Sequence, residues 1–177
     1  IITPMQGLED MGVEVNYVRG CNVTGGSDDL SDGSLCRQMI SDSDATILIM
    51  GLNQSIEAEG IDRKTLLLPK AQRVVIESAS HCSKARSPRA PVILVVMTGG
   101  PIDLSPYKSN NSIDAILYTS YPGQAGGKAL AHTLYGRYNP SGRLVTTLYQ
   151  NSFLNEVALE DMRMRPGPET LEGKEEY

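Results

Sequence analysis

The sequence is poor in the residues that most often anchor a small core or a disulfide scaffold. It has 177 residues with no tryptophan, one phenylalanine and three cysteines. The core must therefore be built from Ile, Leu, Val, Met and Ala, and the length is sufficient for about one domain. Three cysteines are too few for a disulfide scaffold. A bridge between Cys21 and Cys36 is the one disulfide that the sequence leaves open.

Features of membrane and nucleic-acid-binding proteins are also missing. No apolar run approaches the roughly 18–20 residues that span a bilayer, so we expect no membrane partner. The net charge of −5 is spread along the chain, without a basic stripe that could neutralise phosphates. We therefore expect no nucleic-acid partner either.

Sequence motifs for metal, nucleotide and serine chemistry are absent as well. The cysteines and the two histidines, His81 and His132, lack the spacing of metal ligands, so we expect neither a metal nor another cofactor. The glycines at 99–100 and 123–127 could cradle an anion, but neither group has the order of a phosphate-binding loop. No serine lies in a G-x-S-x-G context, which argues against a serine hydrolase.

Apolar patterns predict an alternation of strands and helices. The strands are expected at residues 13–18, 45–50, 91–97, 114–118 and 143–149. The helices are expected at the start of the chain, from Ser31 or Asp32 to about residue 43, from Pro69 onward, and over 123–135 before Gly136. This order predicts an α/β fold, a three-layer sandwich whose mostly parallel sheet is covered by helices on both faces. The domain is expected to span residues 1–150, with 151–177 as a tail or linker.

The stretch ATILIMGLNQSIEAEGIDR, residues 45–63, places an acidic loop directly after a buried strand. Open α/β sheets put their chemistry outside the carboxyl ends of the strands. Glu57 and Glu59 are the one close carboxylate pair beside such a strand end, and in an extended loop both would point the same way. One could act as a general acid while the other tunes it or binds a hydroxyl, or both could simply be solvated.

The conformation of this loop has two interpretations. Gly60 interrupts the pattern and favours a structured loop, and a helix over residues 55–64 is the alternative. Asp62 and Arg63 are expected to form an ion pair that pins the loop. The chemistry would then rest on the two glutamates.

Four segments follow one another in a characteristic order: GLNQSIEAEGIDR, LLLP, PVILVVMTGGPIDLS and ILYTSYPGQAGGKALAHTLYGRYNPSGRL. Together they resemble the carboxyl-terminal α/β-sandwich domain of glycoside hydrolase family 3, in the branch of the plant β-xylosidases/α-L-arabinofuranosidases. The likeness extends over residues 1–164, which is nearly the whole chain.

The resemblance implies a retaining glycosidase whose two catalytic carboxylates lie on two domains. The aspartate nucleophile belongs to an N-terminal barrel domain that is not in this chain, so the chain is expected to be a fragment that is inactive alone. The acid/base glutamate maps onto the Ile-Glu-Ala-Glu segment, and we place it at Glu57, with Glu59 as the alternative. That glutamate must hold a proton when the oligosaccharide or aryl glycoside arrives. The substrates implied are β-D-xylosides and α-L-arabinofuranosides of cell-wall polysaccharide.

Two other interpretations stay open. The fragment could be a non-catalytic module that binds carbohydrate or another protein, and the strand order alone would also suit a nucleotide-binding, flavodoxin-like domain. Sequons at Asn22, Asn53 and Asn110 favour, together with the resemblance, a secreted protein of the extracellular space or cell wall. A glycan at Asn53 would crowd the acidic loop, so this sequon is expected to be unmodified.

Overall fold

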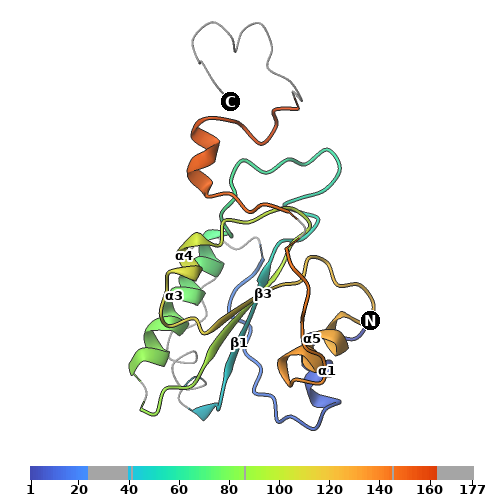
Figure 1. Cartoon of the computed structure of the whole chain (residues 1–177), viewed down its shortest axis with the longest axis vertical. Helices are drawn as coiled ribbons and strands as arrows, with labels where there is room; N and C mark the ends of the chain where they lie inside the picture. Colours follow the sequence, from blue (N-terminus) through green and yellow to red (C-terminus); the bar gives the residue numbers. More distant parts are fainter. Residues whose placement is uncertain (24–39, 41, 86, 145, 163–177) are drawn as a thin grey trace, which may run out of the picture.

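In the part of the chain that the structure describes, the central element is a parallel sheet of three strands. The computed structural model describes residues 1–23, 40, 42–85, 87–144 and 146–162. The strands are β1 (Thr46–Gly51), β2 (Val92–Met97) and β3 (Ala115–Tyr118), in the order β1-β2-β3. The register places Leu48 beside Leu94 and Leu94 beside Ile116. The strands therefore end at the same edge of the sheet (Figure 1).

Helices cover both faces of this sheet (Figure 1). On one side lie the long helix α3 (Lys70–Ala85) and the short helix α4 (Ser105–Lys108). On the other side lie α1 (Pro4–Glu9) and α5 (Gly126–Leu134), which pack against each other. The predicted three-layer α/β sandwich with a parallel sheet is confirmed.

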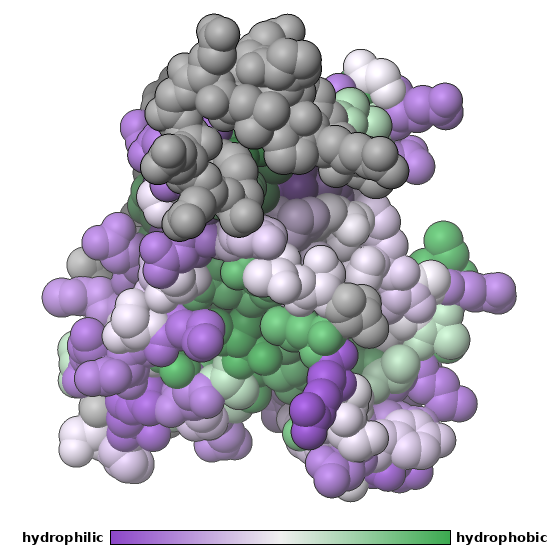
Figure 2. Space-filling model, turned by 45° about the horizontal axis from the view of Figure 1, so that its top comes forward, coloured by the Kyte–Doolittle hydropathy of each residue, from purple (hydrophilic) through white to green (hydrophobic). Residues whose placement is uncertain are grey.

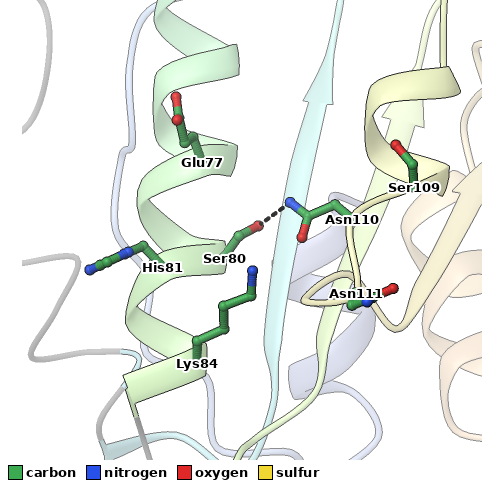
Figure 3. A pocket seen from close by; sticks show the side chains of 7 residues that line it. All are labelled: Glu77, Ser80, His81, Lys84, Ser109, Asn110 and Asn111. Atoms are coloured by element: carbon green, nitrogen blue, oxygen red, sulfur yellow. Dashed lines mark hydrogen bonds between the residues drawn. The ribbon is translucent and has the colours of Figure 1, made fainter.

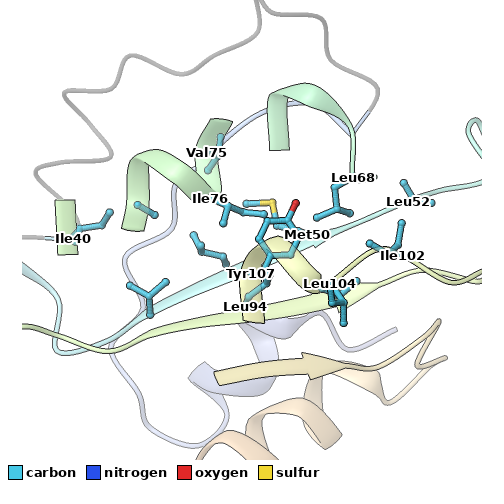
Figure 4. Packing of buried hydrophobic residues seen from close by; sticks show 14 residues of the cluster. Ile40, Met50, Leu52, Leu68, Val75, Ile76, Leu94, Ile102, Leu104 and Tyr107 are labelled. Carbon is cyan, nitrogen blue, oxygen red and sulfur yellow. The ribbon is translucent and has the colours of Figure 1, made fainter. Parts of the chain in front are cut away.

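The core lies between the sheet and α3 (Figure 4). β2 is the middle strand, and its residues Val92, Leu94 and Val96 are fully inaccessible to solvent. Such a continuous apolar strand is typical of a parallel sheet that is covered on two sides. Ile76 of α3 and Tyr107, in α4, belong to the same cluster. Because the chain has no tryptophan and one phenylalanine, aliphatic side chains and this tyrosine fill the space.

A buried glutamine fixes the carboxyl end of β1. Gln72 of α3 accepts a hydrogen bond from the Gly51 amide (2.8 Å) and donates one to the Gly51 carbonyl (2.7 Å). A side chain at Gly51 would overlap the carbonyl of Met97 on β2, so only glycine lets the two strand ends approach this closely. The loop that follows β1 therefore starts from a defined position against β2.

Apolar side chains also reach the surface. Figure 2 shows apolar residues gathered in the middle of one face, between hydrophilic margins. In the described part of the chain, Ile49, Ile61 and Tyr121 are 39%, 46% and 48% exposed. None of the described helices is long and apolar enough to cross a membrane.

The strongest apolar patterns are confirmed. β1, β2 and β3 match the expectations at 45–50, 91–97 and 114–118. α3 and α5 match two of the expected helices, and Gly136 (φ 71°) follows α5 in the left-handed conformation that glycine favours. Long continuous runs and helix-period stripes therefore located the elements that surround the core.

Two predicted strands are wrong. The described residues of 13–18 and 143–149 form no ladder with the sheet. Apolar alternation accompanies at most partial burial there, and a strand also needs a neighbour to pair with. The helix predicted to end near residue 43 lies mostly outside the described residues. Cys36 lies outside them too, so its bridge to Cys21 stays a prediction.

Sequence patterns missed how the chain is fastened after residue 150. Asn151–Asn155 form a 3-10 helix, η2, where the sequence predicts a tail or linker. The backbone amide of Asn151 donates to Asp103 Oδ2 (2.8 Å). The side-chain oxygen of Asn151 accepts from Thr65 Oγ1 and from the Leu66 amide, both at 2.8 Å. The Asp103 amide donates in turn to the Leu66 carbonyl (2.8 Å). Contacts thus continue past the expected domain boundary.

We predict that Gly127→Ala destabilises the domain by about 1–3 kcal/mol, because the added methyl group would overlap the backbone of α1's N-terminal end, and backbone cannot move aside as a side chain can. A Cβ at Gly127 would overlap the carbonyl of Thr3, and a Cβ at Gly7 would overlap the carbonyl of Gly127. Urea denaturation followed by circular dichroism measures the change. Gly142→Ala is the matched control, because nothing lies near a Cβ at that position. Equal free energies of unfolding for the two variants would show that α1 and α5 do not depend on this contact.

We predict that Asp103 makes stability depend on pH in the acid range. Burial opposes its ionisation, but hydrogen bonds from Ser105 and from the Asn151 amide outweigh burial and hold the pKa of Asp103 below its ordinary value of 3.8. A lowered folded-state pKa gives stability that is complete above the unfolded-state value and is lost as pH falls through the folded-state value. Asp103→Asn should therefore lose less unfolding free energy than the wild type between about pH 4 and about pH 2. Urea titrations at both pH values measure this, and identical losses would contradict it.

Candidate active site

The loop between β1 and α3 is structured and carries a tight hairpin. The Glu57 amide donates to the Asn53 carbonyl (3.0 Å). In the residues that follow, Ala58 and Ile61 pair in an antiparallel bridge. Gly60 takes a left-handed conformation (φ 75°) in the turn between them. The prediction of a structured loop is confirmed, and the alternative of a helix is not.

The carboxylate of Glu57 accepts three hydrogen bonds and forms an ion pair with Arg63. Its Oε1 lies 2.5 Å from both the Gly99 amide nitrogen and the Tyr121 hydroxyl, and its Oε2 lies 3.2 Å from the Gly100 amide nitrogen. Arg63 adds its Nε at 3.2 Å from Oε2, and the Arg63 and Glu57 side chains are only 9% and 13% exposed. A carboxylate has about four lone-pair positions, so the three hydrogen bonds and the ion pair occupy most of the acceptor capacity of Glu57.

Two glycines at the end of β2 make this arrangement possible. A Cβ at Gly99 would lie 2.9 Å from the Tyr121 ring and 3.1 Å from Glu57 Oε1, and a Cβ at Gly100 would overlap the Arg63 guanidinium. The sequence suggested that these glycines could cradle an anion, and the anion is the Glu57 carboxylate of the same chain. The glycines at 123–127 lie instead in the turn before α5 and in its contact with α1.

Arg63 joins the acidic loop to the segment after β2. Besides its ion pair with Glu57, Arg63 donates from Nη1 to the Pro101 carbonyl (3.0 Å). The ion pair predicted between Asp62 and Arg63 is wrong, because Arg63 pairs with Glu57 while Asp62 is exposed and forms no ion pair with Arg63. Neighbouring residues of an extended segment point to opposite sides, and the inward side of this one holds the Glu57 carboxylate.

Tyr121, from the segment after β3, is a member of the site that sequence reasoning missed. Burial of its hydroxyl, then its hydrogen bond to Glu57 and the charge of that carboxylate, raise the pKa of Tyr121 to about 12. Nearby, Thr98 Oγ1 and Tyr118 Oη both bond the Gly100 carbonyl, at 2.7 and 3.0 Å. No motif links Tyr121 to Glu57, and the available signal was a Tyr-Pro-Gly turn directly after a predicted strand.

Glu59 lies in a different environment, although one residue separates it from Glu57. It lies in the hairpin between Ala58 and Ile61, it is exposed, and it makes no hydrogen bond or ion pair with another described residue. Because the loop is not extended, the two glutamates do not share one orientation. One carboxylate is bound within the chain, whereas the other meets no partner among the residues that the structure describes.

Two cavities open on the surface of the described residues. One, of about 370 Å³, borders the acidic loop and is lined by apolar and basic side chains that include Leu68 and Arg73. The other, of about 380 Å³, lies between α3 and the turn after α4 and is polar (Figure 3). There the Asn110 amide donates to Ser80 Oγ (3.2 Å), so the nitrogen of this sequon is already engaged. Among the described residues, no group of three or more His, Cys, Asp or Glu is arranged to hold a metal ion.

The chain is similar to known glycosidases over nearly its whole length. A family model of the glycosyl hydrolase family 3 C-terminal domain matches residues 2–174. β-Xylosidase/α-L-arabinofuranosidase 1 of Medicago sativa subsp. varia is 40% identical over 169 residues, which are 95% of this chain and 21% of that protein. Exo-1,4-β-xylosidase xlnD of Emericella nidulans is 35% identical over 94% of this chain and 20% of that protein.

Solved structures share the fold as well. A family 3 exo-β-xylosidase (XlnD), in complex with a xylobiose aziridine activity-based probe, matches with a TM-score of 0.83 and 32% identity over 96% of this chain and 21% of that one. A family 3 β-glucosidase of Bifidobacterium adolescentis matches with a TM-score of 0.66 and 27% identity over 83% of this chain and 21% of that one. The chain thus spans about a fifth of the length of these relatives. It belongs to glycoside hydrolase family 3 and corresponds to the C-terminal domain of that family.

Proposed function

We propose that this chain supplies the acid/base glutamate of a retaining exo-glycosidase that hydrolyses β-D-xylosides. The names of its relatives, β-xylosidases and exo-1,4-β-xylosidases, support this substrate class. One relative is also named an α-L-arabinofuranosidase, so α-L-arabinofuranosides are a second substrate class in the proposal. The reaction requires no metal and no other cofactor.

The hydrogen-bond pattern favours Glu59 as the acid/base. A general acid must hold a proton, release it to the leaving oxygen and later take one from water. Glu57 accepts three hydrogen bonds and pairs with Arg63, so the hydrogen of a protonated carboxyl would have to turn towards one of these groups. Glu59 is exposed in the hairpin and meets no such donor among the described residues. Glu57, which we placed first from the resemblance, remains the alternative.

In the proposed reaction this domain acts together with an N-terminal barrel that carries an aspartate nucleophile. The two carboxyl groups of a retaining glycosidase stand about 5–5.5 Å apart. The aspartate attacks the anomeric carbon while Glu59 protonates the departing oxygen, which leaves a covalent glycosyl-enzyme. Glu59 then takes a proton from a water molecule as that water attacks the anomeric carbon and releases the aspartate. In this reaction Glu59 must hold a proton before the substrate reacts.

Exposed apolar side chains beside the hairpin support such a partner domain. Ile61 in the hairpin and Tyr121 next to Glu57 are 46% and 48% exposed. Apolar surface of this kind is often covered by another domain. Since the nucleophile and the floor of the sugar site lie on the barrel in this proposal, the chain alone is inactive. We also propose a secreted enzyme of the extracellular space or cell wall, with Asn53 unmodified.

We predict turnover only when the chain is joined to a barrel. In the test, this chain replaces the matching segment of the Medicago enzyme, and hydrolysis of p-nitrophenyl β-D-xyloside is followed for the chimera and for the chain alone. Glu59→Ala in the chimera should lower kcat by about 10²- to 10⁴-fold, because acid/base catalysis is lost. Added azide attacks the glycosyl-enzyme without needing a base, so it should restore turnover and yield xylosyl azide.

Other outcomes would separate the competing interpretations. Wild-type turnover by the Glu59→Ala chimera would contradict the assignment of the acid/base to Glu59. Turnover by the chain alone would mean that the chain contains its own nucleophile. An inactive chimera whose folded C-terminal domain still binds xylo-oligosaccharides would favour the non-catalytic carbohydrate-binding module instead.

A further inference from the structure

Both ends of the acidic hairpin are fastened to one segment after β2. Glu57 precedes the hairpin and accepts hydrogen bonds from two consecutive amides of the segment 99–101, at 2.5 and 3.2 Å. Arg63 follows the hairpin and donates to the carbonyl that ends this segment (3.0 Å). The ion pair between Glu57 and Arg63 closes the base of the hairpin. Residues 58–62 therefore form a short loop whose two ends, Glu57 and Arg63, lie side by side and are both bound to residues 99–101.

The segment to which the hairpin is fastened is itself well supported. The Gly100 carbonyl accepts hydrogen bonds from Thr98 Oγ1 (2.7 Å) and Tyr118 Oη (3.0 Å), and Thr98 is fully buried. Tyr121 brings the segment after β3 onto the same Glu57 oxygen (2.5 Å) that the Gly99 amide binds. The hairpin is therefore held by β3 and by the segments that follow β2 and β3.

We propose that Glu57 is a positioning residue that sets the direction in which the hairpin presents Glu59. This inference rests on the proposed function of Glu59 as acid/base. Glu57 acts through the backbone of the hairpin and touches neither the sugar nor the nucleophile. A displacement of about 1 Å in a catalytic group can lower a rate by about 100-fold, so even a small rotation of the hairpin matters.

Conservative variants can separate the charge of Glu57 from its shape. Glu57→Gln keeps the shape, but it has one oxygen in place of two. Its NH₂ group therefore faces the groups that one carboxylate oxygen now binds, either the Gly99 amide and the Tyr121 hydroxyl or the Gly100 amide and Arg63. Glu57→Asp keeps the charge on a side chain one methylene shorter. Tyr121→Phe removes one donor and leaves the carboxylate in place.

We predict a loss in kcat with little change in KM. In the chimera, Glu57→Gln lowers kcat for p-nitrophenyl β-D-xyloside by about 10- to 100-fold and changes KM by less than about 3-fold. Glu57→Asp recovers part of the loss, and Tyr121→Phe shows a smaller loss than Glu57→Gln. Azide does not rescue Glu57→Gln, because Glu59 is still present to act as the base, whereas azide does rescue Glu59→Ala.

The fastening itself can be measured in the chain without a barrel. Amide hydrogen exchange followed by NMR should be faster at Gly99 or Gly100 in Glu57→Gln than in the wild type, because the two amides bind different carboxylate oxygens and glutamine keeps only one oxygen. The matched control is Glu59→Gln, which changes the same residue type two positions away and should leave both exchange rates unchanged. Circular dichroism establishes that each variant is folded under the conditions of the assay.

The outcomes distinguish this inference from the function on which it rests. Wild-type kcat for Glu57→Gln, with Glu59→Ala inactive and rescued by azide, would overturn the positioning role alone. Azide rescue of Glu57→Gln would show that Glu57 is itself the acid/base. Wild-type turnover by Glu59→Ala would overturn the proposed function. Should Glu57→Gln fail to fold, wild-type kcat in both Glu57→Asp and Tyr121→Phe would overturn the positioning role.

Discussion

A single carboxylate connects three loops at the edge of the sheet. Glu57 receives two backbone amides from the loop after β2, a hydroxyl from the loop after β3, and the guanidinium of Arg63 from its own loop. Hydrogen bonds to an ionised group are roughly twice as strong as those between neutral groups. Loss of this carboxylate would leave two amides without their acceptor and the largely buried Arg63 side chain without its ion-pair partner, which is costly.

The fold brings these groups together because its strands are parallel. The carboxyl ends of β1, β2 and β3 lie at one edge, and the Gln72 side chain and the glycine at residue 51 set where the first loop leaves the sheet. From there the two glutamates take separate tasks in our account. Glu57 is held within the domain, whereas Glu59 meets no partner among the described residues and, in our proposal, completes a site whose other carboxylate lies on another domain. A catalytic group needs such a fixed support if it is to meet its substrate in the right geometry.

The sequence predicted the fold class and the structured acidic loop better than it predicted the contacts of that loop. Continuous apolar runs located β1, β2 and β3 because buried parallel strands carry that signal directly. The segments 13–18 and 143–149 show why alternation alone is insufficient, since pairing depends on neighbours that a local pattern does not contain. The acidic loop was found because it follows a buried strand. The bonds from Gly99 and Tyr121 to Glu57 join residues 42 and 64 positions apart, and no local pattern encodes them.

The most direct test of this account is the distance between carboxyl groups in a crystal structure of the chimera with a xylobiose-derived covalent probe. Our account predicts that the Glu59 carboxyl lies about 5–5.5 Å from the nucleophilic aspartate of the barrel, the separation of a retaining glycosidase. It also predicts that Glu57 still binds the Gly99 and Gly100 amides in that structure. A Glu57 carboxyl that has left these amides and stands at that distance from the aspartate, with Glu59 turned to solvent, would contradict the account.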